Sequence, residues 1–247
     1  MSNDKAPFSW EDPFQLRDQF SEEERLILES ARNYAQDKLL PRVQKAFREE
    51  VFDREIMNEF GSLGMLGATL PEKYGCANSN YVSYGIMARE VERVDSGYRS
   101  AMSVQSSLVM HPIHAYGDEA QREKYLPKLA TGEWVGCFGL TEPNHGSNPG
   151  GMESRFIDKG DYFLLNGSKL WISNSPFADI AVVWAKNENN RIQGLIVETS
   201  MDGVSTPETH NKWSLRGSVT GEIIFDNVKV PKNNLLTGKD GLGAPLG

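Results

Sequence analysis

One stretch of the sequence brings glycine, hydroxyl and amide residues together directly after an apolar run. The run WVGCFGL leads into residues 138–147, FGLTEPNHGS, which contain Thr141, Ser147 and two glycines. A loop of this composition can point backbone N–H groups and hydroxyls at an anion or at the polar edge of a ring. A tight loop that only joins two strands explains the same residues, so both interpretations stay open.

A second stretch places an aromatic ring beside a hydroxyl. In KLWISNS, residues 169–175, strand alternation puts Trp171 and Ser173 on one face. An indole can lie against a flat heterocycle while the hydroxyl hydrogen-bonds a ring nitrogen. A tryptophan in the core is the alternative.

A third group of charged residues precedes SAMSVQSSLVM, residues 100–110, an uncharged segment that predicts a helix buried on most sides. A guanidinium beside such a helix needs an anionic partner. Either Glu92 or Asp95 is the partner of Arg99, or Arg99 and Ser100 hold a ligand carboxylate while Glu92 orients the guanidinium. The residues alone do not separate these alternatives.

Several other chemistries are disfavoured. The sequence contains no HExxH, GxSxG or GxxxxGK[ST] motif. His111 and His114 flank Pro112 without a third ligand, so we expect no metal site. Cys76 and Cys137 are isolated, which is typical of small apolar residues in a reduced cytosol.

The composition indicates a folded chain with an acidic surface. The 247 residues include 26 Lys and Arg against 34 Asp and Glu, for a net charge of -8, and 39% are hydrophobic. An acidic surface is a poor match for nucleic acid. No apolar run approaches the roughly 20 residues of a membrane span. The opening MSNDKAPFSWEDPF has no signal or transit pattern, so we expect a cytoplasmic protein.

The first part of the chain has helical periodicity. The segment from Ser21 to Glu24 predicts a capping box, followed by an apolar helix face. Residues 81–94 predict another helix, and Asp118 begins one that kinks or ends near Pro127.

After Trp134 the patterns become short and strand-like. Asn166-Gly167, between two strand-like runs, predicts a two-residue hairpin turn. Strands at this spacing predict a small antiparallel β sandwich or barrel. The fold class is therefore α+β, with a helical domain over residues 1–133 and a β-rich domain over residues 134–247. The glycine-rich end GKDGLGAPLG leads to the expectation that a third segment is missing.

Several motifs, in the same order, resemble the flavin-dependent acyl-CoA dehydrogenases. They are YLPKLATGE (residues 125–133), CFGLTEPNHGSN (137–148), LNGSKLWISN (165–174) and KWSLRGSVTGEIIFDNVKVP (212–231). Two more, SGYRSAMSVQSSLVMHPI (96–113) and FSWEDPF (8–14), look most like the glutaryl-CoA type. The resemblance covers essentially the whole chain. It implies a helical N-terminal domain, a β middle domain and a C-terminal four-helix bundle, and the bundle is absent here.

The resemblance also implies the site residues. FAD would contact Phe138, Gly139, Leu140, Thr141, Glu142, Pro143, Asn144, Gly146, Ser147, Trp171, Ile172 and Ser173. Ser173 stands where a threonine is usual, and Asn148 replaces a common aspartate. Substrate would contact Arg99, Ser100, Ser147 and Glu92, with Arg99 and Ser100 on the distal carboxylate of glutaryl-CoA.

The implied reaction is α,β-dehydrogenation of an acyl-CoA. A carboxylate base removes the α-proton while the β-hydride passes to the flavin. Glutaryl-CoA would give crotonyl-CoA after decarboxylation, and an electron-transfer flavoprotein would take the electrons. The family's base is a glutamate of the C-terminal domain, so we expect the isolated chain to be inactive. The family's homotetramer would form through the same domain.

Three alternatives stay open. The enzyme could instead be a monocarboxylic acyl-CoA dehydrogenase or an acyl-CoA oxidase. A non-catalytic module that binds flavin, acyl-CoA or a partner protein is the alternative of another class.

Overall fold

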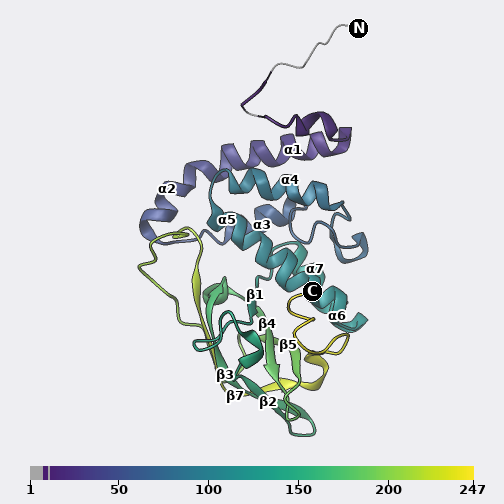
Figure 1. Ribbon diagram of the computed structural model, residues 1–247, viewed down its shortest axis with the longest axis vertical. Helices are drawn as coiled ribbons and strands as arrows, with labels where there is room; N and C mark the ends of the chain where they lie inside the picture. Colours follow the sequence, from purple (N-terminus) through teal and green to yellow (C-terminus); the bar gives the residue numbers. More distant parts are fainter. Residues whose placement is uncertain (1–7, 11) are drawn as a thin grey trace.

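The computed structural model describes residues 8–10 and 12–247. Residues 1–7 and Glu11, which belong to the opening segment read for targeting signals, lie outside the described residues. The chain forms a helical part followed by a β-rich part, and Figure 1 shows the two stacked end to end. The α-helices are α1 (Glu22–Tyr34), α2 (Leu40–Glu49), α3 (Glu55–Ser62), α4 (Tyr81–Glu92), α5 (Ser96–Ser103), α6 (His111–Tyr116) and α7 (Glu119–Ala130).

The ends of the helices follow the local sequence. Ser21 and Glu24 form the predicted capping box at the start of α1. Asp118 forms a second box with Gln121 at the start of α7. Helix α7 begins after Asp118 as predicted and ends at Ala130, three residues after Pro127.

The uncharged segment, residues 100–110, forms the middle of a long helical run. Helix α5 passes into a π-helical stretch, Val104–Met110, and then into α6 without a break. Most of its apolar side chains are buried as predicted, including Met102, Val109 and Met110. Leu108 stays partly exposed.

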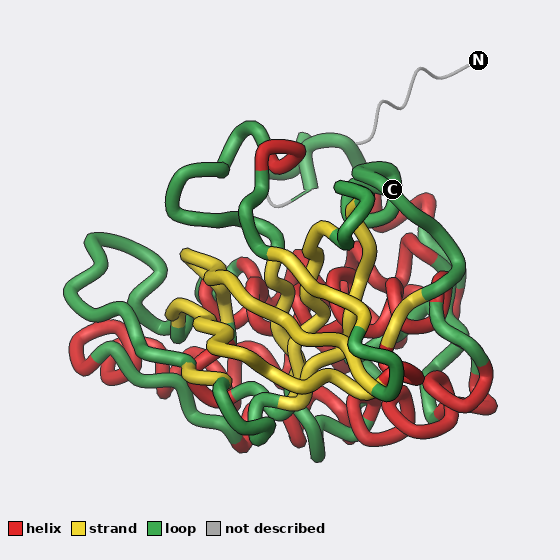
Figure 2. Tube along the Cα trace, turned by 90° about the horizontal axis from the view of Figure 1, so that it is seen from below, coloured by secondary structure: helices red, strands yellow, loops and turns green. Residues whose placement is uncertain are grey.

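The β-rich part is a single sheet of eight strands in the described residues. The order is β6-β7-β3-β2-β4-β5-β8, and β1 pairs with β4 in parallel. A single residue pair joins β2 to β4 in parallel, and the remaining pairings are antiparallel. Figure 2 shows the strands in front of the helices. The strands are β1 (Gly136–Gly139), β2 (Arg155–Asp158), β3 (Tyr162–Ser173), β4 (Ile180–Lys186), β5 (Ile192–Glu198), β6 (Val204–Ser205), β7 (Thr220–Pro231) and β8 (Leu235–Leu236).

The predicted hairpin turn at Asn166-Gly167 was wrong. Strand β3 runs straight through these residues and pairs with β7 on both sides of a register shift between Leu165 and Gly167. Gly167 has a φ of 139°, and a Cβ there would lie 2.4 Å from Ser154 Oγ. The glycine therefore allows a bulge and a close crossing of the chain. The turn between β2 and β3 lies at Gly160 instead.

Strand β4 is buried on both faces and joins the two parts. Its residues Ile180, Val182 and Trp184 pack in the same core as the helices. The residues between them, which include Ala181 and Val183, point to the opposite face of the strand and pack in a second core made of residues of the β-rich part. The two-residue period of a strand therefore connects one core to the other.

Three further features bear on the excluded chemistries. No helix in the described part of the chain is long and apolar enough to cross a membrane. Among residues 8–10 and 12–247, no three His, Cys, Asp or Glu side chains gather in a way that could hold a metal ion. Cys76 and Cys137 are both buried free thiols.

Candidate functional site

The first two patches of the sequence meet at one cavity. This cavity of about 200 Å³ lies between the long helical run and the sheet. Its lining residues are Val104, Leu108, Phe138, Leu140, Thr141, Trp171, Ile172 and Ser173. Six of these eight residues belong to the predicted flavin set, so the separate stretches at residues 138–141 and 171–173 do converge.

Main-chain and side-chain bonds hold the two stretches together. Leu170 N–H donates to Thr141 O over 2.9 Å. Lys169 Nζ donates to Leu140 O over 3.2 Å and to Glu142 Oε1 over 2.8 Å. Gly139 leaves room for this lysine, since a Cβ there would lie 3.1 Å from Lys169 Cγ. The loop after β1 is therefore fixed against the end of β3.

An irregularity in β3 turns the indole outward. The register against β7 shifts between Lys169 and Ile172, and Trp171 has a φ of 61°. Trp171 is 59% exposed and Ser173 half-buried, whereas Ile172 is buried in the sheet core. Trp171 and Ser173 both line the cavity, beside this register shift.

A second, larger cavity continues past the same tryptophan. It has a volume of about 510 Å³ and is lined by Trp171, Ser173, Thr220 and residues 209–215. This loop is tied to Glu50, the residue that follows α2, since Asn211 N–H donates to Glu50 Oε2 over 2.7 Å. Arg216 completes the tie by an ion pair with Glu50. Trp171 and Ser173 thus form a wall between the two cavities.

The rest of the predicted flavin loop lies apart from the smaller cavity. Glu142 and His145 exchange main-chain hydrogen bonds across a tight turn. This turn exposes Pro143, Asn144, Gly146 and Ser147 to solvent. None of these four residues lines the cavity.

Glu142 is buried, and both of its carboxylate oxygens accept hydrogen bonds. Besides Lys169, its carboxylate accepts hydrogen bonds from the N–H groups of Glu153 and Ser154. Burial alone raises the pKa of Glu142, but the Glu153 N–H and Lys169 outweigh it and hold the pKa below its usual value. The side chain therefore fixes the loop and does not face the cavity.

The third patch forms a separate network that joins the end of α4 to α5. Arg99 Nε donates to Glu92 Oε2 over 2.6 Å, and Arg99 Nη1 donates to Ser103 Oγ over 3.1 Å. Arg99 and Ser96 both donate to Glu92 and lower its pKa. Asp95 instead accepts from Gly97 N–H at the start of α5. The ambiguity over the partner of Arg99 is thereby removed in favour of Glu92.

Arg99 keeps donors free for a ligand. Its side chain is 39% exposed, and only Nε and Nη1 are bound within the described residues. Neither Arg99 nor Ser100 lines the cavity itself. Ser100 lies one turn before Val104, so the network and the cavity occupy neighbouring rows of one helix.

The sequence did not single out three residues that build the site. Val104 and Leu108 form the helical wall of the cavity, and their signal was their four-residue spacing in an otherwise small-residue helix. Lys169 was the third. Its signal was a lysine within an apolar strand, together with an acidic residue, Glu142, in the loop after β1.

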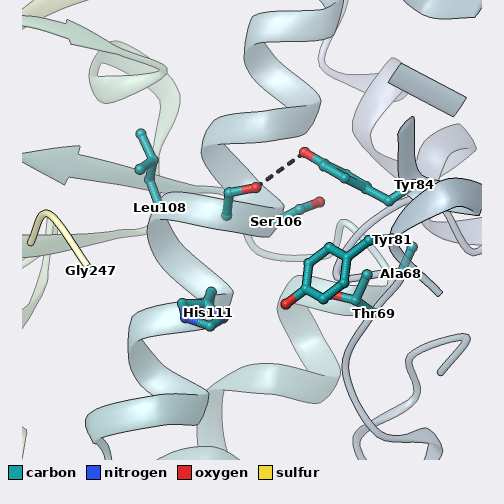
Figure 3. Close-up of a pocket in the computed structure, with 9 residues that line it drawn as sticks. Ala68, Thr69, Tyr81, Tyr84, Ser106, Leu108, His111 and Gly247 are labelled. Carbon is teal, nitrogen blue, oxygen red and sulfur yellow. Dashed lines mark hydrogen bonds between the residues drawn. The ribbon is translucent and has the colours of Figure 1, made fainter. Parts of the chain in front are cut away.

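Leu108 also borders a third cavity, of about 290 Å³, between α4 and the π-helical stretch (Figure 3). Tyr81, Tyr84 and His111 line it, and the Tyr84 hydroxyl hydrogen-bonds Ser107 Oγ at 3.1 Å. It contains none of the predicted site residues.

Comparisons with known proteins bear on this arrangement. Residues 21–133 match the acyl-CoA dehydrogenase N-terminal domain, and residues 137–228 match the acyl-CoA dehydrogenase middle domain. A solved glutaryl-CoA dehydrogenase from Mycobacterium smegmatis in complex with FADH2 is 45% identical, with a TM-score of 0.92 over 94% of this chain and 60% of that one.

Two curated proteins are also similar. The mitochondrial isovaleryl-CoA dehydrogenase of Pongo abelii is 37% identical over 87% of this chain and 53% of its own length. The caffeyl-CoA reductase-Etf complex subunit of Acetobacterium woodii is 36% identical over 88% of this chain and 59% of its own length. The chain thus spans a little over half of these relatives and shares both matched domains, so it belongs to the acyl-CoA dehydrogenase family.

Proposed function

We propose that this chain binds FAD in the cavity of about 200 Å³ and forms part of a glutaryl-CoA dehydrogenase. The observation that carries the proposal is that Thr141 and Trp171, from separate stretches, line one cavity with the helical run that bears Arg99. The FADH2 held by the solved relative supports the choice of cofactor.

The residues present fit a flavin. Phe138, Leu140 and Trp171 supply apolar and aromatic walls, and the hydroxyls of Thr141 and Ser173 suit the polar edge of a ring. The cavity is smaller than the roughly 300–1,000 Å³ usual for small-molecule sites. The remaining length of the cofactor therefore needs the cavity of about 510 Å³ that shares Trp171 and Ser173.

The position of Arg99 suits a dicarboxylic acyl group. Arg99 and Val104 are five positions apart, so their Cα atoms are offset by about 7.5 Å along the helix axis. An extended five-carbon chain covers about 5 Å, and a charge-assisted hydrogen bond adds about 2.8 Å. Glu92 would hold the guanidinium in orientation while Ser100 adds a hydroxyl. A butyryl chain offers no carboxylate to this network.

In the proposed reaction glutaryl-CoA loses an α-proton to a base and a β-hydride to an acceptor, and the product then loses CO2 and takes up one proton to give crotonyl-CoA. When bound, the flavin supplies the acceptor for the hydride. An electron-transfer flavoprotein would take the electrons, which agrees with the similarity to the Etf-complex subunit. Glu142 cannot serve as the base, because its buried carboxylate already accepts from Lys169 and from the N–H groups of Glu153 and Ser154 and does not line the cavity.

Titration with FAD tests the cofactor site. We expect the purified chain to bind FAD, and Trp171→Ala to weaken binding about tenfold, since aromatic stacking and burial together contribute roughly 1.4 kcal/mol. Trp10→Ala is the control, because Trp10 is 89% exposed and far along the chain from the cavity. Equal FAD affinity in both variants would contradict the assignment.

Competition between two thioesters tests the acyl group. In the FAD-loaded chain, Arg99→Gln should weaken glutaryl-CoA binding about tenfold and leave butyryl-CoA binding unchanged, because only the former has a distal carboxylate. Arg93→Gln is the control, because Arg93 is an exposed arginine in the segment between α4 and α5. A parallel loss for both thioesters would favour a monocarboxylic substrate.

Turnover with ferrocenium as electron acceptor tests the absence of a base. We expect the isolated chain to show little or no dehydrogenation of glutaryl-CoA, since no carboxylate of the flavin loop is free to remove the proton. Robust turnover would show that another residue of this chain acts as the base.

A further inference from the structure

A buried glutamine joins the two walls of the flavin cavity. Gln105 is fully buried in the π-helical stretch. Its Nε2 donates to Leu129 O over 2.9 Å and to Trp134 O over 2.8 Å. Its Oε1 accepts from Gly136 N–H over 2.7 Å. Both side-chain N–H donors and the carbonyl are therefore used, as a buried amide requires.

These bonds act at the point where the helical and β-rich parts meet. Val104, one position before Gln105, lines the cavity from the helix. Gly136 begins β1 and lies two positions before Phe138, which lines the cavity from the sheet. The side-chain amide of Gln105 thus links the helical wall of the cavity, next to Val104, to the strand wall, two positions before Phe138.

The same two elements are in close contact beside this link. A Cβ on Gly136 would lie 2.4 Å from Val109 Cγ1, so a glycine is needed for β1 to approach the helix this closely. The contact limits how near the walls can come, and the Gln105 bonds prevent them from moving apart. Directional bonds fix the position of a wall in a way that apolar contact alone does not.

We propose that Gln105 is a positioning residue that sets the width of the flavin cavity by holding β1 against the helical run. This inference rests on the proposed function, because it concerns the FAD site. A sub-ångström displacement of supporting residues is enough to weaken a preorganised site.

The chain offers a matched control in Gln121. This glutamine is also buried, its Nε2 donates to Asn233 O and Leu235 O, and its Oε1 accepts from Asp118 N–H. It too connects the helical part to the β-rich part, but, unlike Gln105 and Gly136, neither it nor its partners lie within two positions of a residue that lines the flavin cavity. Gln105→Met and Gln121→Met therefore each remove two bonds donated by a side-chain amide and one accepted by it, at different places in the molecule.

The experiment measures the FAD dissociation constant and the urea midpoint of the wild type and both methionine variants. We expect similar losses of stability, but a FAD dissociation constant raised at least about tenfold only in Gln105→Met. Equal FAD affinities in the two variants would overturn the role of Gln105 alone. A wild type that fails to bind FAD would overturn the proposed function, and this inference with it.

A second pair of variants decides the matter if Gln105→Met does not fold. Gly136→Ala should push β1 away from Val109 and weaken FAD binding, whereas Gly136→Ala combined with Val109→Ala should restore most of the affinity. If Gly136→Ala leaves FAD affinity unchanged, or if adding Val109→Ala does not restore it, the spacing of the two walls does not control the cavity.

Discussion

At the scale of single residues, Glu142 and Lys169 form the most deeply buried charge pair among the described residues. Lys169 is 0% exposed and Glu142 4%. Lys169→Met leaves the carboxylate without its counter-charge, and we expect a loss of about 3–5 kcal/mol of unfolding free energy. Urea unfolding measures it. The double variant Lys169→Met with Glu142→Gln should recover only part of the loss, because one amide oxygen replaces only one of the two carboxylate oxygens that accept from the N–H groups of Glu153 and Ser154.

A surface pair provides the control for this prediction. Lys45 and Glu49 lie 3.9 Å apart and are both largely exposed. Lys45→Met should change stability by less than about 0.5 kcal/mol, since solvent screens such pairs. Comparable losses at Lys45 and Lys169 would show that the buried pair does not fix the loop after β1.

At the scale of elements, Gly167 distinguishes the bulge in β3 from the hairpin turn that its neighbour Asn166 suggested. Gly167→Ala combines a positive φ with a clash against the Ser154 main chain, so we expect a loss of about 2–3 kcal/mol. Gly146→Ala is the control, because nothing lies within 4 Å of its added Cβ. Equal urea midpoints for Gly167→Ala and Gly146→Ala would contradict the close contact between Gly167 and Ser154.

The same strand shows what local patterns can and cannot predict. The capping boxes and the buried helix faces depend on residues three or four apart, and the sequence predicted them at Ser21 and in residues 100–110. The bulge at Gly167 depends on Ser154, which lies in another segment and leaves no periodic signal. The pairing of Arg99 with Glu92, and not with Asp95, follows from the helix boundary, because Asp95 caps α5 by accepting from Gly97 N–H.

At the scale of the whole molecule, the order of a helical half and a β half followed from the change of period near residue 133. The mostly antiparallel sheet was predicted, and the parallel pairing of β1 with β4 was not. Pairing partners depend on which apolar face covers which, and β4 carries apolar side chains on both faces. The meeting of residues 138–141 with Trp171 was predicted, but it rested on the family resemblance, since each patch alone had an ordinary structural explanation.

The acid stability of the whole chain follows from its carboxylates. The pKa of Glu92 is lowered mainly by Arg99, while at Glu59 and Glu142 donors outweigh the effect of burial. A carboxyl whose folded pKa lies below the ordinary 4.5 stabilises the protein above pH 4.5 and loses this contribution as the pH falls through the folded value. Burial also lowers the pKa of His114 below 6.5, which adds a smaller loss that begins at higher pH. We therefore expect the urea midpoint to fall gently below pH 6.5 and steeply below pH 4.5. His114→Gln should remove the gentle phase and leave the steep one, and a midpoint that stays constant between pH 5 and pH 3 would show that the folded protein does not hold these carboxylates in their charged form.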